Sequence, residues 1–303
     1  MSPPDVQIGL APPGRHALVL HMVFGHVREP DRSAIVDQLL SGARTAGSDL
    51  TGLIEACRQG NLIGAVWAQV QEGAVAVLWP PRIAEDVQES LAACLIDTAI
   101  EFLQRHQVSM IQCLLESNQD NLAELLRAAG FTPLANLLYL ISTSDSFPKI
   151  LPASSLEFAT FCEDEQERMS RLIECTYEGT LDCPGLNGVR TIEDVLAGYR
   201  ATGVFDPSRW LFVRHDQRDV GCLLLTNHAG AEHWELVYMG LVPEARGRGW
   251  GLEVTRFAQG LARQAGRSRL VLAVDALNVP ALQMYSAAGF VTWDQKTVFL
   301  RTF

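Results

Sequence analysis

The sequence predicts an α/β (α+β) protein built from two tandem units, and three observations carry this prediction. The chain has 303 residues, enough for two domains of about 150 residues each. Its residues are 48% hydrophobic, so each half can bury a core of its own. Strand-like and helix-like patterns recur in the same order in both halves, and the tetrapeptide Ala-Ala-Gly-Phe occurs at residues 128–131 and again at 287–290.

The first half is expected to start with a loose Pro- and Gly-rich lead-in over residues 1–15. A helix is expected to begin near Asp31, because Ile35, Leu39 and Leu40 share one helical face. The turn residues 59–61, Gln-Gly-Asn, predict a hairpin between two strands. The expected elements are a strand at 16–24, a helix at 31–45, strands at 53–57, 62–70 and 74–78, a helix at 85–106, a strand at 108–115, a helix at 122–129 and a strand at 137–141.

The second half repeats this order after a Ser-, Pro- and Asp-rich linker at residues 142–155. We therefore expect one domain over residues 1–148 and another over residues 149–303. The expected elements are a strand at 156–161, helices at 165–178 and 192–202, hairpin strands at 210–214 and 221–226, a strand at 236–242, a helix at 252–262, a strand at 270–274, a helix between 278 and 289, and two closing strands from 290 onward.

The stretch from residue 234 to residue 252 organises the second half. Its apolar run at 236–242 predicts a strand buried on both faces, and Pro243 ends that strand. The turn Arg-Gly-Arg-Gly-Trp-Gly at 246–251 follows and leads directly into a helical pattern. Glycines let backbone N–H groups converge on a phosphate together with the positive end of the helix dipole. The turn lacks the Gly-Lys-Ser/Thr ending of a P-loop and the glycine spacing of a dinucleotide-binding loop.

Two motifs in this half resemble the GNAT superfamily of acyl-CoA-dependent N-acyltransferases. The turn at 246–251 has the Arg-x-x-Gly-x-Gly pattern of that superfamily's pyrophosphate loop. Residues 278–290, Asn-x-x-Ala-x-x-x-Tyr-x-x-x-Gly-Phe, resemble its fourth-helix motif. The layout resembles mycothiol-synthase-type tandem acetyltransferases. The resemblance implies two GNAT-like units, each with a mixed, mostly antiparallel central sheet flanked by helices, and acetyl-CoA as cosubstrate.

The resemblance also implies a donor site. In the family, the two central strands part near residues 239–241 and the pantetheine arm lies between them. Tyr285 is the candidate acid for the departing thiolate, and Trp250 packs either under the turn or against the adenine. The residues expected to bind acetyl-CoA are Met239, Gly240, Leu241, Arg246, Gly247, Arg248, Gly249, Trp250, Gly251, Leu252 and Asn278.

Acylation of an amine also requires a group that removes the ammonium proton. Glu235 lies six residues before Leu241, an offset that resembles the glutamate base of GNAT histone acetyltransferases. In a regular strand, residues 235, 237, 239 and 241 share one face, so Glu235 is expected to look along the cleft. His233 and Asp275 are alternative bases, and a solvated strand-end carboxylate is the structural alternative for Glu235.

The acceptor is expected at residues 176–190, a segment rich in helix breakers. The resemblance places the acceptor site between the first two helices of the unit, where this segment falls. A plain surface loop is the alternative. The candidate acceptor contacts are Tyr177, Glu178, Asp182 and Asn187.

The first half lacks the residues that carry these motifs. In place of the glycine turn it has residues 79–87, with no glycine and with two prolines, which have no N–H to donate. Glu85 and Asp86 would repel a pyrophosphate. Leu126 stands where the second half has Tyr285. We therefore expect a degenerate GNAT-like domain with a supporting role.

Net charge, apolar runs and cysteine spacing disfavour several classes of function. The net charge of -11 disfavours nonspecific nucleic-acid binding, and the sequence has no apolar run of membrane-spanning length. The seven cysteines are scattered without C-x-x-C spacing, so no metal site or disulfide framework is expected. The prediction is a cytoplasmic N-acetyltransferase that moves acetyl from acetyl-CoA to a primary amine of a small molecule in a ternary complex. A non-catalytic acyl-CoA-binding regulator and a protein N-acetylase are the alternatives; the acceptor, the acyl length and a homo-oligomer stay open.

Overall fold

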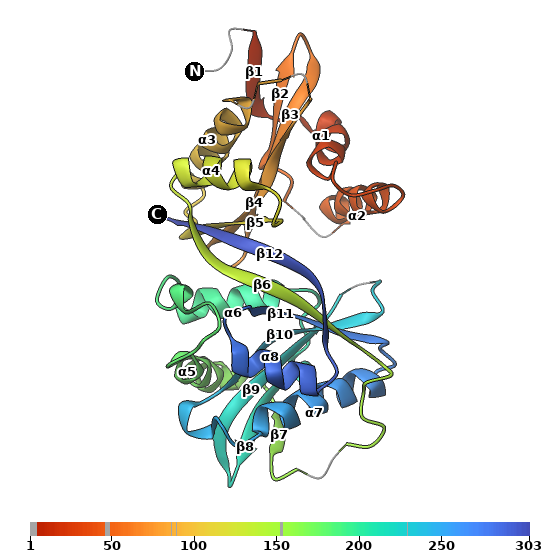
Figure 1. Cartoon of the computed structure of the whole chain (residues 1–303), viewed down its shortest axis with the longest axis vertical. Coiled ribbons are helices and arrows are strands. Elements are labelled where there is room, and N and C mark those ends of the chain that lie inside the picture. Colours follow the sequence, from red (N-terminus) through yellow and green to blue (C-terminus); the bar gives the residue numbers. More distant parts are fainter. Residues whose placement is uncertain (1–4, 46–48, 86, 89, 152–153, 229) are drawn as a thin grey trace. The chain divides into compact units, whose positions relative to one another are not determined.

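The computed structural model describes residues 5–45, 49–85, 87–88, 90–151, 154–228 and 230–303, which form two compact units (Figure 1). The first unit comprises Met1–Leu134 with Thr297–Phe303, and the second comprises Ala135–Lys296. The boundaries fall within two long strands, β6 (Thr132–Thr143) and β12 (Val291–Thr302), whereas we expected a single division after residue 148.

In the first unit the strands follow the order β1-β2-β3-β4-β5-β12. Strands β4 and β5 run parallel, and the other described pairs of this unit are antiparallel. The elements are β1 (Val6–Leu10), α1 (His16–Val23), α2 (Asp31–Thr45), β2 (Leu53–Arg58), β3 (Asn61–Gln71), β4 (Val75–Ile83), α3 (Ser90–Gln104), β5 (Met110–Leu115) and α4 (Asp120–Ala128).

Two predictions for the start of the chain were wrong. Residues 16–23 form helix α1 where we expected a strand, and β1 lies inside the expected loose lead-in. The buried side chains of the helix explain the error: Val19, Leu20 and Val23 lie on one helical face, but in the sequence they belong to an apolar run that fits a strand equally well.

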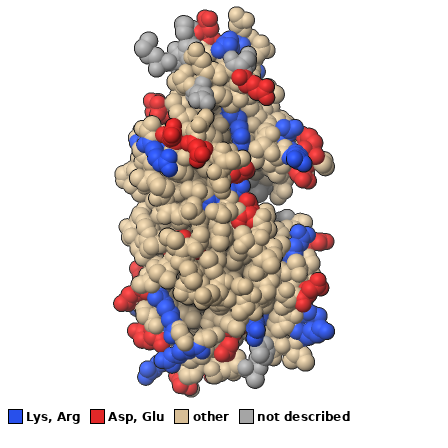
Figure 2. Space-filling view, in the orientation of Figure 1, with Lys and Arg blue, Asp and Glu red and all other residues tan. Residues whose placement is uncertain are grey.

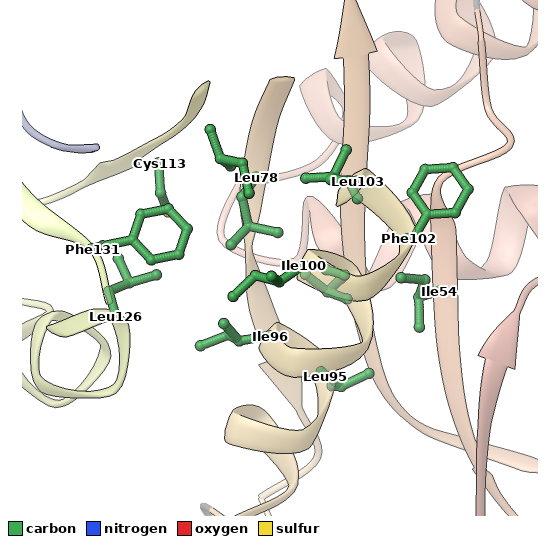
Figure 3. Close-up of a cluster of buried hydrophobic side chains, with 14 of the residues drawn as sticks. Ile54, Leu78, Leu95, Ile96, Ile100, Phe102, Leu103, Cys113, Leu126 and Phe131 are labelled. Carbon is green, nitrogen blue, oxygen red and sulfur yellow. The ribbon is translucent and has the colours of Figure 1, made fainter. Parts of the chain in front are cut away.

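The core of the first unit includes Leu126, which in the sequence repeat stands where the second half has Tyr285. Leu126 of α4 and Phe131 are almost fully buried and share a hydrophobic cluster with Leu78 and Cys113 (Figure 3). Strand β4 continues through both prolines to Ile83, whereas we expected this strand to end at residue 78. Asp86 lies outside the described residues.

The second unit has the strand order β6-β11-β10-β9-β8-β7. Strands β10 and β11 run parallel, and its other described pairs are antiparallel. Its last strand, β12, is continuous from residue 291 to residue 302, so the two expected closing strands are one. The remaining elements are β7 (Glu157–Thr160), α5 (Gln166–Tyr177), α6 (Ile192–Ala201), β8 (Trp210–His215), β9 (Arg218–Asn227), β10 (His233–Leu241), α7 (Trp250–Gln264), β11 (Arg269–Asp275) and α8 (Val279–Ala287).

Helices cover the sheet of the second unit with two separate hydrophobic clusters. One cluster joins α7 and α8 to Leu236, Leu272 and Val274. The other joins α5 and α6 to Phe212 and Leu224. The mixed, mostly antiparallel sheets with flanking helices confirm the expected fold class.

The surface carries charges of both signs. On the face that Figure 2 shows, Lys and Arg side chains lie in small groups beside Asp and Glu side chains, with neutral surface between them. Within the described ranges, none of the helices has both the length and the apolar character needed to cross a bilayer.

Candidate active site

A cavity of about 600 Å³ opens where the two central strands part. Strands β10 and β11 pair in parallel through residues 233–235 and 269–271. Beyond this point residues 236–241 of β10 and Ala273 and Val274 of β11 line the cavity. The parting of the strands that the resemblance implied is therefore present.

A β-bulge at Val237 changes which side chains face the cleft. The pairing of β10 with β9 shifts between Leu236 and Tyr238. Val237 and Tyr238 consequently both pack toward α5 and α6, and Met239 and Leu241 pack toward α7 and α8. Our expectation that residues 235, 237, 239 and 241 share one face was wrong, because the bulge adds a residue and reverses the alternation.

Gly240 allows α5 to approach the strand closely. A Cβ atom at this position would lie 2.6 Å from the Thr176 Oγ1 atom and 2.8 Å from the Tyr238 hydroxyl. The N–H of Val242 donates to Val220 O on the β9 side. Alternation along the strand therefore directs the N–H groups of residues 239 and 241 toward the cavity.

The glycine turn closes one end of the cavity at the start of α7. Gly247, Gly249, Gly251 and Leu252 line the cavity. Gly249 precedes the helix with φ of 80°, a left-handed conformation that favours glycine. The first N–H groups of a helix have no intrahelical acceptor, so this end of α7 can receive an anion.

Two of the three large side chains of the turn, those of Arg248 and Trp250, lie away from the cavity wall, whereas Arg246 lines it. The Trp250 indole is buried in the α7 cluster, where its ring centroid lies 4.6 Å from that of His215. Trp250 thus packs under the turn, one of the two placements we left open. The Arg248 guanidinium lies over this indole, 5.1 Å from the ring centroid, and the Arg248 side chain is exposed.

The Arg246 side chain binds backbone carbonyls. Its Nε donates to Leu241 O at 3.1 Å, its Nη1 to Gly179 O at 3.2 Å and its Nη2 to Thr176 O at 2.9 Å. Three of the five N–H donors of this guanidinium are therefore bound to the protein's own backbone.

Tyr285 of α8 and Asn278, the residue before this helix, line the cavity. Burial raises the pKa of Tyr285 well above its usual value, and the nearby Asp182 carboxylate adds to the rise. The phenol therefore keeps its proton at neutral pH. The Asn278 side chain accepts from the Ala281 N–H at 3.4 Å and caps the helix.

Asp182 is the one of the four predicted acceptor contacts that lines the cavity within the described residues. Its Oδ1 accepts from the Asp275 N–H at 2.8 Å. Loss of hydration raises the pKa of Asp182 although the residue is exposed on the loop; the hydrogen bond from the Asp275 N–H lowers it, and the Asp275 carboxylate raises it. Asp275 is buried and accepts from the N–H groups of Cys183 and Leu277, contacts that hold the loop in place.

The other three predicted acceptor contacts lie outside the cavity wall. The Tyr177 hydroxyl lies 3.0 Å from that of Tyr199, within an aromatic group that includes Tyr238. Glu178 is exposed at the end of α5, and Asn187 Nδ2 donates to Tyr177 O at 3.5 Å. Further wall residues, which we did not predict, lie on both sides of the cavity. They are Thr176, Gly179, Thr180, Leu181, Leu236, Val237, Tyr238, Ala273, Val274, Pro280, Ala281 and Met284.

Glu235 is hydrogen-bonded to a histidine that we did not predict. The His228 Nε2–H donates to Glu235 Oε2 at 2.6 Å. Glu235 is absent from the cavity wall, although Val237 two residues later belongs to it. His233, one of the alternative bases, has its ring centroid 5.3 Å from that of His228. Among the described residues, no group of three or more His, Cys, Asp or Glu is arranged to hold a metal ion.

The cavity, the glycine turn and the parted strands define an acetyltransferase-type domain. Residues 169–290 match the model of the acetyltransferase (GNAT) family, and this part of the chain is a GNAT domain. The chain is similar to the mycothiol acetyltransferase of Stackebrandtia nassauensis, with 30% identity over 149 residues. That alignment covers 47% of this chain and 46% of the relative, so the chain matches about half the relative's length.

Solved structures support the same fold over the whole chain. A GCN5-related N-acetyltransferase from Sphaerobacter thermophilus has a TM-score of 0.71 and 17% identity, covering 99% of this chain and 96% of its own. A tandem GNAT protein from the clavulanic acid biosynthesis pathway has a TM-score of 0.57 and 12% identity, covering 98% of both chains. At these identities the likeness concerns the fold, and it confirms the tandem GNAT-like architecture.

Proposed function

We propose that the second unit transfers the acetyl group of acetyl-CoA to a primary amine of a small molecule within a ternary complex. The observation that carries the proposal is the cavity between β10 and β11, which joins the glycine turn at one end to the Tyr285 phenol at the other wall. A GNAT match over residues 169–290 and relatives named acetyltransferases support the reaction class.

The donor-binding roles follow from the cavity wall. The turn at 247–251 and the start of α7, including the Trp250 N–H, would receive the pyrophosphate. Leu252 would contact the donor through its place on the cavity wall, since its N–H donates to Gly249 O at 3.1 Å. The N–H groups at 239 and 241 would bind the pantetheine arm or polarise the thioester carbonyl. Asn278 would contact the arm from α8. Arg248 is exposed and free to meet a phosphate if its side chain leaves Trp250.

The ammonium nitrogen loses two protons when it becomes an amide, and the departing thiolate gains one. The amine nitrogen forms a bond to the acetyl carbon, and the bond between that carbon and sulfur breaks. Glu235 accepts the ammonium proton through water, because its side chain is not part of the cavity wall. The Tyr285 phenol donates its proton to the departing thiolate, and the second proton that leaves the amine nitrogen restores the phenol. Asp182, on the wall near Tyr285, would bind the ammonium group of the acceptor.

The first unit is proposed as a support without a donor site of its own. Its β4 continues as a strand where the second unit has the glycine turn, and Leu126 replaces the phenol with a buried apolar side chain. Placement in the cytoplasm and the division into a degenerate domain at 1–148 and a catalytic domain at 149–303 belong to the same proposal.

A second candidate, a non-catalytic acyl-CoA-binding regulator, is supported by the position of Glu235 off the cavity wall. The test is release of free CoA thiol from acetyl-CoA with a panel of amines: polyamines, amino sugars, amino acids and a peptide with a free N-terminus. The proposal expects release that depends on at least one small amine. Release with the peptide alone would indicate a protein N-acetylase, and tight acetyl-CoA binding without release would indicate the regulator.

A further inference from the structure

One wall of the cavity is a short loop that follows α5. Gly179, Thr180, Leu181 and Asp182 all line the cavity. We propose that Arg246 is a positioning residue that ties this loop to the glycine turn, so that the donor-binding and acceptor-side elements form one structural unit. The proposal rests on the proposed function only because that function identifies which side of the cavity binds the donor and which binds the acceptor.

The three hydrogen bonds of Arg246 join two distant parts of the chain. Thr176 and Gly179 precede Arg246 by 70 and 67 residues and lie at the end of α5 and just beyond it. Leu241, the third acceptor, is the last residue of β10. Each bond ends on a backbone carbonyl, so the guanidinium fixes the backbone of the loop and that of the central strand at the same time.

The end of α5 suits a cation in this place. The last four carbonyls of a helix have no intrahelical donor, and Thr176 O is one of these because α5 ends at Tyr177. The negative end of the helix dipole also attracts a positive side chain. Arg246 therefore donates hydrogen bonds both to Thr176 O, at the end of α5, and to Gly179 O just beyond the helix.

The other end of the loop is anchored to β11. Asp182 Oδ1 accepts from the Asp275 N–H, and Asp275 Oδ2 accepts from the Cys183 N–H at 3.2 Å. Thr180 and Leu181 thus form a strap between two anchors, Arg246 and Asp275. Both anchors belong to elements that line the donor cavity, which links the shape of the acceptor wall to the donor site.

The geometry requires arginine rather than any cation. A guanidinium presents donors in a planar fork that can reach three carbonyls in different directions, whereas a lysine ammonium is a compact point charge on a flexible stem. A phosphate contact, in contrast, tolerates lysine as a point charge. The two roles of Arg246 can therefore be separated by Arg246→Lys.

The test is hydrogen–deuterium exchange of the free protein over residues 177–184, in wild type, Arg246→Lys and Arg246→Gln. We expect exchange about tenfold faster in both variants, since local opening no longer has to break the Arg246 bonds. Arg256→Gln, an exposed substitution on α7, should exchange like wild type. Thermal unfolding establishes that each variant is folded. If Arg246→Gln does not fold, Arg246→Lys, which keeps the charge, decides the exchange test by itself.

Unchanged exchange of this loop in Arg246→Lys would overturn the proposal. Calorimetric titration of CoA gives a second decision: equal weakening in the Lys and Gln variants supports a positioning role, and wild-type affinity in the Lys variant contradicts it. Failure of wild type to bind CoA would remove the proposed function, but the exchange of the free protein would still decide the role of Arg246.

Discussion

The His228 Nε2 atom lies 2.6 Å from the Glu235 Oε2 atom, and the two side chains are about one-third exposed. The histidine follows the end of β9, and the glutamate lies on the neighbouring strand β10. The hydrogen bond to Glu235 raises the pKa of His228 above its usual value. Loss of solvent contact lowers the pKa of the adjacent His233, as does the charge of His228.

This pair makes stability depend on pH. A histidine whose pKa is raised by folding stabilises the protein fully below its unfolded pKa of about 6.5, and that contribution disappears as pH rises through the folded pKa. His228→Gln should therefore lower the free energy of unfolding by about 0.5 kcal/mol near pH 5.5 and by nearly nothing at pH 9. Urea denaturation at both pH values checks this; an equal loss at both would show that the ion pair is not the cause.

Substitution of the candidate base should separate chemistry from donor binding. Glu235→Gln is expected to lower kcat by about 100-fold, because the carboxylate no longer takes the ammonium proton. The Kd for acetyl-CoA should stay unchanged, since Glu235 is not part of the cavity wall. Steady-state kinetics and calorimetry measure the two quantities, with the exposed Glu232→Gln as control. If Glu235→Gln keeps the wild-type kcat, Glu235 is not the base.

Removal of the Tyr285 hydroxyl should lower kcat and leave the packing of the ring nearly unchanged. Tyr285→Phe keeps the buried ring that packs on Phe290 at a centroid distance of 5.4 Å. It removes the proton donor for the thiolate, so we expect kcat to fall by about 100-fold with acetyl-CoA affinity retained. Pre-steady-state measurement of thiol release is the direct assay. A loss of affinity with normal turnover would assign Tyr285 to donor binding only.

A methyl group at Gly240 should disturb the contact between β10 and α5. The added atom would overlap Thr176 and the Tyr238 hydroxyl, and overpacking of this kind typically costs about 1–3 kcal/mol. Gly240→Ala should thus lower the midpoint of chemical denaturation and the affinity for acetyl-CoA together. Gly14→Ala is the control, because a Cβ there meets nothing within 4 Å. If Gly240→Ala is as stable as wild type, α5 can move away from β10 and make room for the added methyl group.

Local sequence patterns could predict the elements that create the donor cradle. The apolar run before Pro243, the glycines after it and the helical spacing that follows correspond to β10, the turn and α7. These features are readable because each depends on neighbours within a few residues. The Gly249 conformation is of the same kind, since a positive φ at a helix start favours glycine wherever it occurs.

Features that depend on distant contacts could not be predicted. The bulge at Val237 is visible only in the pairing of β10 with β9, and it reverses the face of every later residue on the strand. The acceptors of Arg246 lie up to 70 residues away, so its motif position suggested a phosphate contact although its guanidinium binds carbonyls. The partners of β6 and β12 likewise follow from long-range pairing, which the linker composition did not indicate.

We propose that this chain has a single donor site, in the second unit. Calorimetric titration of acetyl-CoA into wild type and Gly249→Glu tests it most directly. We expect one equivalent bound by wild type and none by Gly249→Glu. The added carboxylate would repel the pyrophosphate, and a residue with a side chain would be strained at the φ of 80°. Two equivalents, or undiminished binding by Gly249→Glu, would contradict it.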